Sequence, residues 1–283
     1  MAWRWQPGAP RLLSLWANRD EWYARPTQPL AVWPENPAWV GGRDLLAGGS
    51  WLLVDTAAGR LAAITNVREA QGASPGTPGA RQSADQHAPP ALLSRGALVA
   101  QVLAAGRLDT SAIDPTRYAG FNLLFLDWRA GKAAVCTNRS AHRMPGQALL
   151  KPVGFGSGSL SNGPPDAPLP KQQRLAAALD AACHAVDTHT WAQAGWQALR
   201  DRWIDPALAS SRYATDRFEE RALAPVFVDT PLYGTRQSTL LQVDADGKLC
   251  MWERSWIRAR SAQSGADLER DFSEAVWPTA CLR

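Results

Sequence analysis

The sequence predicts an α+β protein in which antiparallel β-hairpins form most of the fold. Residues 51–65, 121–136 and 239–252 repeat one pattern: an apolar run, an aspartate, a Gly-basic pair and a second apolar run. Apolar runs around an Asp/Gly turn are typical of hairpins, because aspartate bonds its own backbone and glycine supplies a positive φ. Helical segments lie between the hairpins, and this mixture favours the α+β class.

The predicted strands are apolar at nearly every position, as residues 121–127 illustrate. A strand with one face in water alternates apolar and polar residues, whereas a strand covered on both faces does not. The hairpins therefore predict sheets that are buried on both sides.

Helices are predicted over residues 92–105, 171–186 and 190–204. The first has apolar residues at helical spacing and ends at Gly106, because glycine commonly terminates a helix. The second is rich in alanine and leucine and follows a cluster of prolines, which favours a helix start at that point.

A single domain is predicted over residues 1–283, because the hairpin pattern continues on both sides of the main break in composition. That break, at about residues 71–90, is rich in Gly, Ser, Pro, Ala and Gln. Such a composition predicts a mobile, solvated insertion and not a linker between domains.

Composition and charge argue against several classes of protein. The 283-residue chain has no apolar run long enough to span a membrane, and its first residues do not resemble a secretory signal. The net charge of +4 comes from an arginine-rich composition that is typical of a GC-rich, bacterial genome. No basic cluster with interleaved aromatic residues suggests binding to nucleic acid.

The four cysteines are far apart in the sequence and form no CxxC pair. This spacing predicts neither a zinc site nor a disulfide scaffold, and no other metal site is predicted. It favours a reducing compartment, and we expect a cytoplasmic location. The cysteines are Cys136, Cys183, Cys250 and Cys281.

An apolar run near the N-terminus ends in the charged sequence Asn18-Arg19-Asp20-Glu21. One interpretation is a salt-bridged turn that fixes the N-terminal strand, because most charge runs are structural or solvated. The other interpretation is a functional site. The residues alone leave both open.

This run and seven further segments resemble the NRDE family, the group that contains transport and Golgi organisation 2-like proteins. The segments follow the order of the family and extend from about residue 3 to residue 256. They are 48–52 (GGSWL), 59–66 (GRLAAITN), 94–96 (SRG), 120–123 (GFNL), 160–162 (LSN), 234–239 (GTRQST) and 253–255 (ERS).

The resemblance implies a four-layer αββα sandwich similar to the N-terminal nucleophile hydrolases, with two stacked, mainly antiparallel sheets and a truncated first strand. The nearest chemical likeness is to cysteine amidohydrolases, whose N-terminal cysteine is the nucleophile and whose α-amine is the base. Arg19 and Asp20 resemble the pair that orients this nucleophile. Asn66 and Asn162 resemble oxyanion-binding residues, and Arg236 resembles a distal substrate-binding arginine.

Several of these positions also have structural interpretations. Asn66 and Asn162 are equally well explained as turn caps, and Arg236 as half of a surface ion pair. Asn18 and Glu21 have no counterpart in the hydrolases and are particular to the NRDE group. The predicted ligand-binding residues are Asn18, Arg19, Asp20, Glu21, Trp51, Asn66, Asn122, Asn162 and Arg236.

The start of the sequence departs from the family pattern. Members usually begin Met-Cys and continue as an apolar strand, whereas this sequence begins Met1-Ala2-Trp3. We expect about five residues, including the cysteine, to be encoded upstream; the alternative is a natural variant without the nucleophile. Since this sequence has no such nucleophile, no catalytic residue is certain. The candidates are Arg19, Asp20, Asn66, Asn162 and Arg236.

Three functions remain open at this point. The first is binding or trafficking of an apolar ligand with an anionic end, such as haem or a lipid or acyl-CoA, with Arg19 and Arg236 on the anion. The second is an N-terminal cysteine amidohydrolase or thioesterase. The third is a structural protein that has lost its chemistry.

Two further observations bear on the ligand. Half of the 14 tryptophans lie within residues 3–51, where they either line a pocket or pack in the core. Haem would be cargo and not a resident cofactor, because the sequence contains no strong haem motif. The histidines, none in a ligand pattern, are His87, His142, His184 and His189.

Overall fold

The computed structural model describes residues 1–68, 92–141, 147–208, 219–257 and 271–277. The predicted insertion at about residues 71–90 lies outside these ranges, as do His87 and His142.

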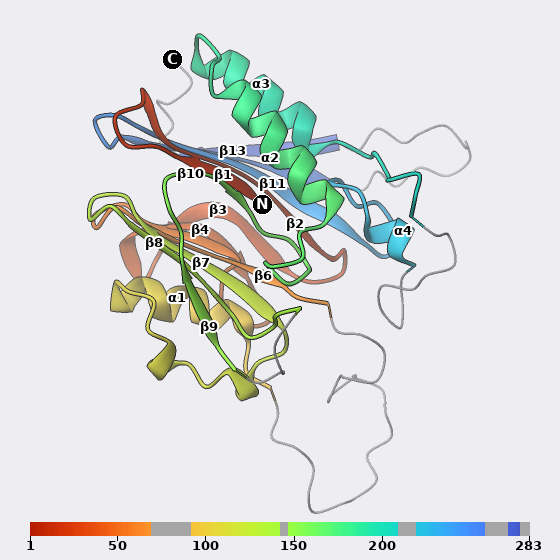
Figure 1. The fold of residues 1–283 in the computed structure, drawn as a ribbon, viewed down its shortest axis with the longest axis horizontal. Coiled ribbons are helices and arrows are strands. Elements are labelled where there is room, and N and C mark those ends of the chain that lie inside the picture. Colours follow the sequence, from red (N-terminus) through yellow and green to blue (C-terminus); the bar gives the residue numbers. More distant parts are fainter. Residues whose placement is uncertain (69–91, 142–146, 209–218, 258–270, 278–283) are drawn as a thin grey trace, which may run out of the picture.

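Two stacked antiparallel sheets form the centre of the molecule (Figure 1). The first sheet combines strands from both ends of the chain, and each neighbouring pair is antiparallel. In spatial order its strands are β10 (Gly156–Ser159), β1 (Ala2–Trp5), β2 (Arg11–Trp22), β11 (Tyr233–Asp244), β12 (Leu249–Ile257) and β13 (Asp271–Trp277).

The second sheet is a meander in which the spatial order of the strands follows the sequence. Each strand pairs with the next, so this sheet has no crossover, although the connection from β6 to β7 is long and contains a helix. Its strands are β3 (Thr27–Trp33), β4 (Asn36–Asp44), β5 (Leu52–Asp55), β6 (Arg60–Asn66), β7 (Phe121–Asp127), β8 (Lys132–Thr137) and β9 (Leu149–Pro152).

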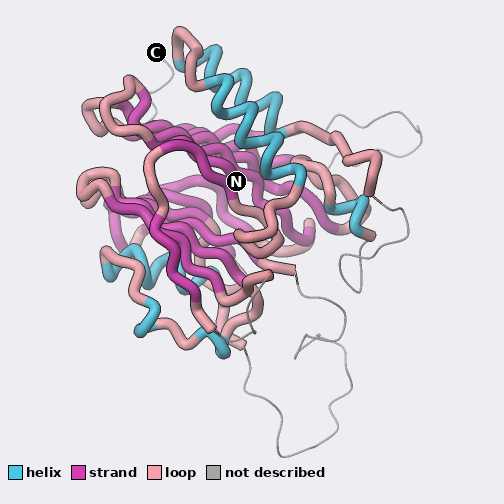
Figure 2. Tube along the Cα trace, in the orientation of Figure 1, coloured by secondary structure: helices cyan, strands magenta, loops and turns pink. Residues whose placement is uncertain are grey.

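Helices cover the two outer faces, so the layers run helix, sheet, sheet, helix (Figures 1 and 2). The helices α2 (Pro170–Ala182) and α3 (Thr188–Leu199) pack on the first sheet, and α1 (Arg95–Ala105) packs on the second. This arrangement confirms the predicted α+β sandwich. The remaining helical pieces are α4 (Glu220–Leu223) and short 3₁₀ turns at Thr110–Ala112 and Pro115–Arg117.

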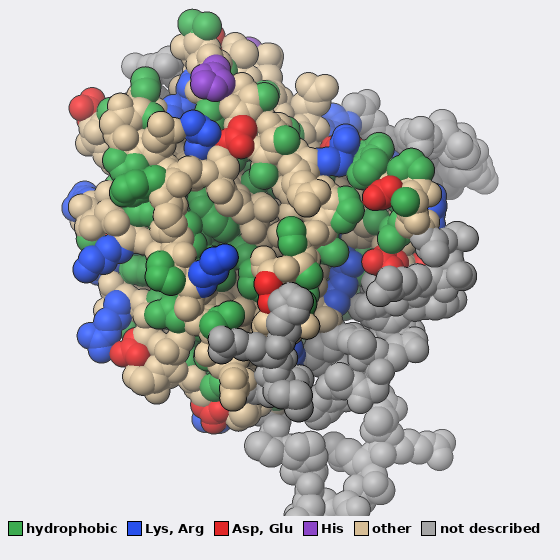
Figure 3. Space-filling model, in the orientation of Figure 1, with side chains coloured by type: hydrophobic (Ala, Val, Ile, Leu, Met, Phe, Trp, Pro, Cys, Tyr) green, Lys and Arg blue, Asp and Glu red, His purple; other side chains and the backbone are tan. Residues whose placement is uncertain are grey.

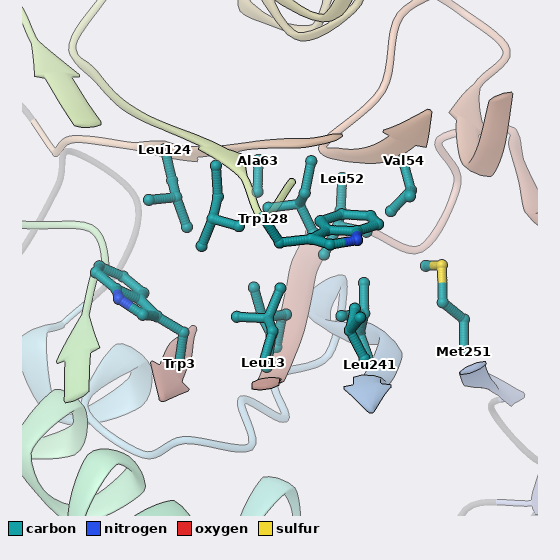
Figure 4. Close-up of a cluster of buried hydrophobic side chains, with 14 of the residues drawn as sticks. Trp3, Leu13, Leu52, Val54, Ala63, Leu124, Trp128, Leu241 and Met251 are labelled. Carbon is teal, nitrogen blue, oxygen red and sulfur yellow. The ribbon is translucent and has the colours of Figure 1, made fainter. Parts of the chain in front are cut away.

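The core between the sheets explains why the strands are apolar throughout. Trp3, Leu13 and Leu241 project from the first sheet, and they meet Leu52 and Trp128 on the second sheet's side (Figure 4). The opposite faces of both sheets are buried under helices. Each fully buried leucine contributes about 1.5–3 kcal/mol relative to an exposed one, so the four-layer order is strongly favoured.

The three predicted hairpin turns are present, and they form as the sequence indicates. The aspartate of each turn accepts backbone N–H bonds from residues within the next four. The glycine of each turn has a positive φ: 73° at Gly59, 64° at Gly131 and 80° at Gly247.

Replacing Gly131 with alanine is expected to reduce the free energy of unfolding by about 1 kcal/mol. A Cβ at Gly131 would have no atom within 4 Å, so the left-handed φ of 64° is the cause of the cost. Gly154→Ala is the matched control, because Gly154 also has open space but no positive φ. Urea unfolding measures both variants, and an equal effect of the two would contradict this explanation.

The strand β2 has different neighbours along its length. The strand β11 pairs with it from Arg11 to Trp22, whereas β1 pairs with residues 13–16 alone. Past Ala17, β2 has no strand on the β1 side within the described residues. The predicted charged run lies in this open segment.

The observed elements differ from the predicted ones in several places. The first helix begins at Arg95 and not at residue 92, and the third ends at Leu199 and not at residue 204. The second ends at Ala182, four residues before its predicted end. The strands β3, β4, β9, β10 and β13 were not predicted, because none of them belongs to an Asp/Gly hairpin.

The cysteines agree only in part with the predicted reduced state. Cys136 and Cys183 are free, whereas Cys250 is disulfide-bonded, so the prediction is wrong at Cys250. Burial raises the pKa of the Cys136 thiol to about 11, and this thiol is therefore unreactive at neutral pH.

Two other expectations concern membranes and nucleic acid. No helix among the described residues has the length and apolar character needed to span a bilayer. On the face shown in Figure 3, basic and acidic side chains are interspersed.

Candidate functional site

A cavity of about 620 Å³ opens where β1 stops and β2 continues. Residues of both sheets and of the first turns of α1 and α2 line it. Seven of the predicted ligand-binding residues are among them: Asn18, Arg19, Asp20, Glu21, Trp51, Asn66 and Asn162. Asn122 and Arg236 do not line the cavity.

The charged run divides between the two faces of the first sheet. Arg19 contacts Thr27 and Trp51 on the second sheet's side, whereas Asn18 contacts the end of α3. Successive side chains of a strand point to opposite faces, so Glu21 follows Arg19 and Asp20 follows Asn18. All four line the cavity because it wraps around the open edge of β2.

The guanidinium group of Arg19 is held from several directions. It lies over the Trp51 ring, 4.5 Å from the centroid, and Nη1 donates to Thr27 Oγ1 (3.0 Å) and Gln237 Oε1 (3.2 Å). Burial lowers the pKa of Arg19, and the charges of Glu21 and Asp44 oppose this change. Arg19 is thus a rigid cation in the cavity wall.

Two carboxylates are shared between two arginines beside this group. Asp44 Oδ2 lies 2.7 Å from Arg25 Nε and 3.8 Å from Arg19 Nη2. Glu21 Oε2 lies 3.6 Å from Arg19 Nη2 and 3.7 Å from Arg25 Nε. The salt-bridged turn and the site, which the sequence offered as alternatives, are therefore present together.

Asn18 is fully engaged in hydrogen bonds within the protein. Its Nδ2 donates to Leu199 O (2.8 Å) and Val226 O (2.9 Å), and its Oδ1 accepts from Ser238 Oγ (2.6 Å). Ser238 Oγ in turn accepts from Trp256 Nε1 (2.8 Å). This network ties β2 to the end of α3 and to the segment before β11.

Asp20 is the carboxylate on the helix side of the cavity. Its Oδ1 accepts from Thr235 Oγ1 (2.7 Å), which fixes its position against β11. Its charge raises the pKa of Lys171 and of the amino group of Met1, although burial of each group has a larger, opposite effect. Burial and the charge of Asp20 together raise the pKa of Tyr233.

The amino group of Met1 also lies in the cavity wall. It donates to Leu160 O (2.8 Å) from a buried position. Burial and the nearby charge of Lys171 lower its pKa to about 5. At neutral pH this amine is therefore unprotonated.

The two predicted asparagines on neighbouring loops face the same space. Asn162 Nδ2 donates to Asn66 O (3.0 Å), and Asn162 O accepts from Arg68 N (2.8 Å). The side-chain amide of Asn66 makes no hydrogen bond to the described residues and is exposed to the cavity. Turn capping alone does not explain this free amide.

Asn122 positions this part of the wall from behind. It is fully buried, and its Nδ2 donates to Ser161 O (3.1 Å) and Gly163 O (2.9 Å). These bonds flank Asn162 and hold its loop against β7. Asn122 thus acts on the site through Asn162.

Arg236 occupies a bulge in β11 near the charged run. Its Nη1 donates to Trp22 O (3.0 Å) and Arg25 O (2.8 Å), so it clasps the turn after β2. This arrangement differs from the surface ion pair that was the structural interpretation of Arg236.

Several site residues were not identified from the sequence. The cavity carries four cationic side chains (Arg19, Arg25, Arg95 and Lys171) and three anionic ones (Asp20, Glu21 and Asp44). Lys171 could have been noticed as one of only four lysines, placed at a predicted helix start. Most of the other residues that line the cavity lie in no sequence pattern that predicts a place in the site.

The tryptophans are mainly core residues and do not form an aromatic pocket. Trp5, Trp16, Trp191 and Trp252 are almost completely buried between layers. Trp22 and Trp51 are the tryptophans that line the cavity, and Arg19 covers the Trp51 ring. The cavity wall is consequently polar in character.

Metal and haem ligation find little support in the geometry. Among the described residues no three histidine, cysteine or acidic side chains are grouped to hold a metal ion. His184 and His189 are exposed and do not line the cavity.

The fold and the site together define a class of protein: a two-sheet α+β sandwich with a polar, charged cavity beside the open edge of a central strand. The chain belongs to the Transport and Golgi organisation 2 family, whose model matches residues 1–258. The resemblance drawn from the charged run and its companion segments is thereby confirmed.

Animal relatives of this family match most of the chain. The chain is 30% identical over 276 residues to the human Transport and Golgi organization protein 2 homolog, with 87% of each chain covered. It is 31% identical over 268 residues to the Bos taurus homolog, again with 87% covered. It is 24% identical over 292 residues to the Drosophila melanogaster protein, with 96% of each covered.

Proposed function

We propose that the protein binds a small amphipathic ligand with an anionic end in the cavity beside β2. The observation that carries this proposal is the charge of the wall, which includes four cationic side chains and three anionic ones. A volume of about 620 Å³ is within the range of small-molecule sites. The side-chain amide of Asn66, which makes no hydrogen bond to the described residues, would add a hydrogen bond to an oxyanion.

An apolar rim at the mouth supports the amphipathic character of this ligand. Leu92 and Leu93 line the cavity and are 38% and 39% exposed, and Ala47 also lines it. The loop that carries Ala47 packs against the start of α1, where Ser50 N donates to Gly96 O. An acyl chain leaving a polar head in the cavity would meet this rim.

A lipid or acyl-CoA fits this wall better than haem does. A haem site would place histidine, cysteine or another axial donor and broad apolar surfaces around the ring. The described lining residues include no histidine or cysteine. Haem therefore remains the second choice of ligand, and the cytoplasmic location remains a prediction from the sequence.

Asn66→Asp is expected to weaken binding of decanoate roughly tenfold, because a new carboxylate in the wall repels the anionic end. Binding of 1-decanol, which has no charge, should change less than about twofold. Titration calorimetry with both ligands, and absorbance titration with haem, measure these affinities. Asn66 is exposed, so the variant should fold normally.

Asn36→Asp is the matched control for this experiment. Asn36 Oδ1 accepts from Ala38 N (3.1 Å) at the start of β4, and an aspartate keeps this bond. The control should bind decanoate as the unchanged protein does. If none of the three ligands binds saturably, the proposed ligand class is wrong.

Hydrolysis is the second candidate function, and the grouping of residues favours it over a purely structural role. Arg19, Asp20, Asn66 and Asn162 line one cavity together with Met1, and they resemble the residues that serve the nucleophile of N-terminal nucleophile hydrolases. Hydrolysis is tested on a version that begins with the expected upstream Met-Cys segment. Turnover of a decanoyl thioester, measured as release of its thiol and lost when this cysteine is changed, would favour hydrolysis. Saturable binding without turnover would favour the binding protein.

A further inference from the structure

Lys171 is a buried amine in the wall of the cavity. It lies in the first turn of α2, it is 9% exposed, and it faces the cavity beside Gln172. Its Nζ donates to Leu223 O (3.0 Å) and Pro225 O (3.4 Å). Neither acceptor carries a formal charge, so Lys171 has no ion-pair partner within salt-bridge distance among the described residues.

Three features of this position disfavour the ammonium form. Burial is the largest, and the second is the charge of Arg68, whose Nη2 donates to the same Leu223 O (3.0 Å). The third is the N-terminal end of α2, where the helix dipole is positive. Asp20 opposes these effects, yet the pKa of Lys171 is lowered to about 8.

The other titratable groups near Lys171 do not cancel the lowering of its pKa. The amino group of Met1 is itself unprotonated at neutral pH. Tyr233 remains neutral, because its pKa is raised. Glu220 acts on Arg68 and partly compensates that cation. A substantial minority of Lys171 is therefore the free amine near pH 7.5.

The hydrogen bonds match the needs of a free amine. A neutral lysine has two N–H donors and one lone pair, and the two carbonyl groups of Leu223 and Pro225 accept both donors. The lone pair of Nζ then accepts no hydrogen bond. A buried amine that keeps its lone pair is a nucleophile, as desolvated lysines beside a second cation are in known imine-forming sites.

We propose that Lys171 is a nucleophilic residue that forms an imine with an aldehyde or ketone entering the cavity. The Nζ lone pair forms a C–N bond to the carbonyl carbon, and the carbonyl oxygen takes a proton. Loss of both amine hydrogens and this oxygen as one water molecule leaves a C=N bond. Atoms and electrons balance without an oxidant or a reductant.

The site has groups that suit each stage of this reaction. The neutral imine has no N–H, but when its nitrogen takes up a proton from water the new iminium N–H can donate to the nearer acceptor, Leu223 O. The longer hydrogen bond, from Nζ to Pro225 O (3.4 Å), is the one that breaks when the imine forms. Asp20, whose charge acts on the amine, is the carboxylate placed to stabilise the iminium ion.

The composition of the chain allows a direct test with butanal and sodium cyanoborohydride, which traps an imine as a secondary amine. The protein has four lysines, and Lys132, Lys151 and Lys248 are exposed internal references. The lowered pKa of Lys171, about 8, raises the fraction of this residue that is the free amine at pH 7. Because burial restricts access, we expect labelling at least about tenfold faster than at each reference.

Peptide mass spectrometry of the full chain reads all four lysines in one reaction and separates the α-amine of Met1. The labelling rate of Lys171 should rise with pH and level off above about pH 8. Lys171→Met should remove the fast-labelled site, and Lys151→Arg should leave it. Labelling of Lys171 no faster than the three references would overturn the proposal.

The proposal does not depend on the anionic ligand proposed above. Butanal carries no charge and needs no acyl-binding rim, so fast labelling at Lys171 and failure of decanoate binding are compatible. If Lys171→Met fails to fold, the comparison of the four lysines in the unchanged protein still decides the question.

Discussion

Glu253→Gln is expected to raise the free energy of unfolding by roughly 3 kcal/mol at pH 8 and to leave it almost unchanged at pH 4. Glu253 lies on β12 and is 2% exposed. Its two oxygens accept from Leu30 N (2.8 Å) and Thr239 Oγ1 (3.3 Å). Burial raises the pKa of this carboxyl group to about 7, although both bonds and the charge of Arg19 lower it.

The sign of the effect follows from the two protonation states. Between pH 4.5 and about pH 7 the folded protein holds a proton on Glu253 that the unfolded chain has released. The free energy of unfolding therefore falls as the pH rises through this interval. Glutamine removes the titration, and its carbonyl and amide groups can still bond to Leu30 N and Thr239 Oγ1.

Thermal unfolding at pH 4, 6 and 8 measures this difference. The variant should gain roughly 5–10 °C over the unchanged protein at pH 8, with the gain disappearing toward pH 4. Glu274→Gln is a matched control, because Glu274 is a more exposed acid that pairs with Arg254 at the surface. An equal gain at every pH would contradict the assigned pKa.

Asn18→Ala is expected to destabilise the protein by about 3–4 kcal/mol, because three hydrogen bonds are lost at once. Leu199 O, Val226 O and the Ser238 hydroxyl group would all lose their Asn18 partner. Urea unfolding monitored by tryptophan fluorescence measures the change, since Trp256 reports on the same network.

Asn66→Ala is the control for this variant, because it is the same substitution in the same cavity. The Asn66 amide makes no hydrogen bond to the described residues and is exposed, so its loss should cost less than about 0.5 kcal/mol. Equal effects of the two substitutions would show that the Asn18 network contributes nothing measurable.

The hairpins could be predicted from the sequence because each depends on neighbouring residues. An aspartate, a glycine at positive φ and two apolar runs suffice to form the turn after Asp127 or Asp244. The order of the first sheet could not be predicted in this way. The strand β11 lies beside β2 through pairing between residues more than 200 positions apart.

The site could be predicted in membership but not in the role of each residue. Seven residues identified through the resemblance line the cavity. The side-chain amide of Asn18, however, donates to two carbonyl groups of the protein itself, whose positions depend on α3 and the segment before β11. Arg236 clasps the turn after β2 for a similar reason. The sequence shows the side chain that donates the hydrogen bond, but the backbone carbonyl group that accepts it is brought there by distant parts of the chain.

Lys171 and Glu253 are ionisable residues whose burial could not be predicted from the sequence. A lysine at a helix start and a glutamate in a strand ordinarily lie at the surface, and nothing in their neighbours signals burial. Their altered pKa values arise from the layers stacked over them. The chemically unusual groups of this molecule therefore became apparent only with the fold.

The pairing of β2 with β11 has a consequence for synthesis on the ribosome. All strands of the second sheet are complete once residue 152 has been made, and they follow one another in order. The first sheet must wait until residue 244, because its central pair joins residues 11–22 to residues 233–244. Closing so large a loop is slow, so the nascent chain carries the bare edge of β2 through most of translation. We expect the growing protein to depend on chaperones during that interval.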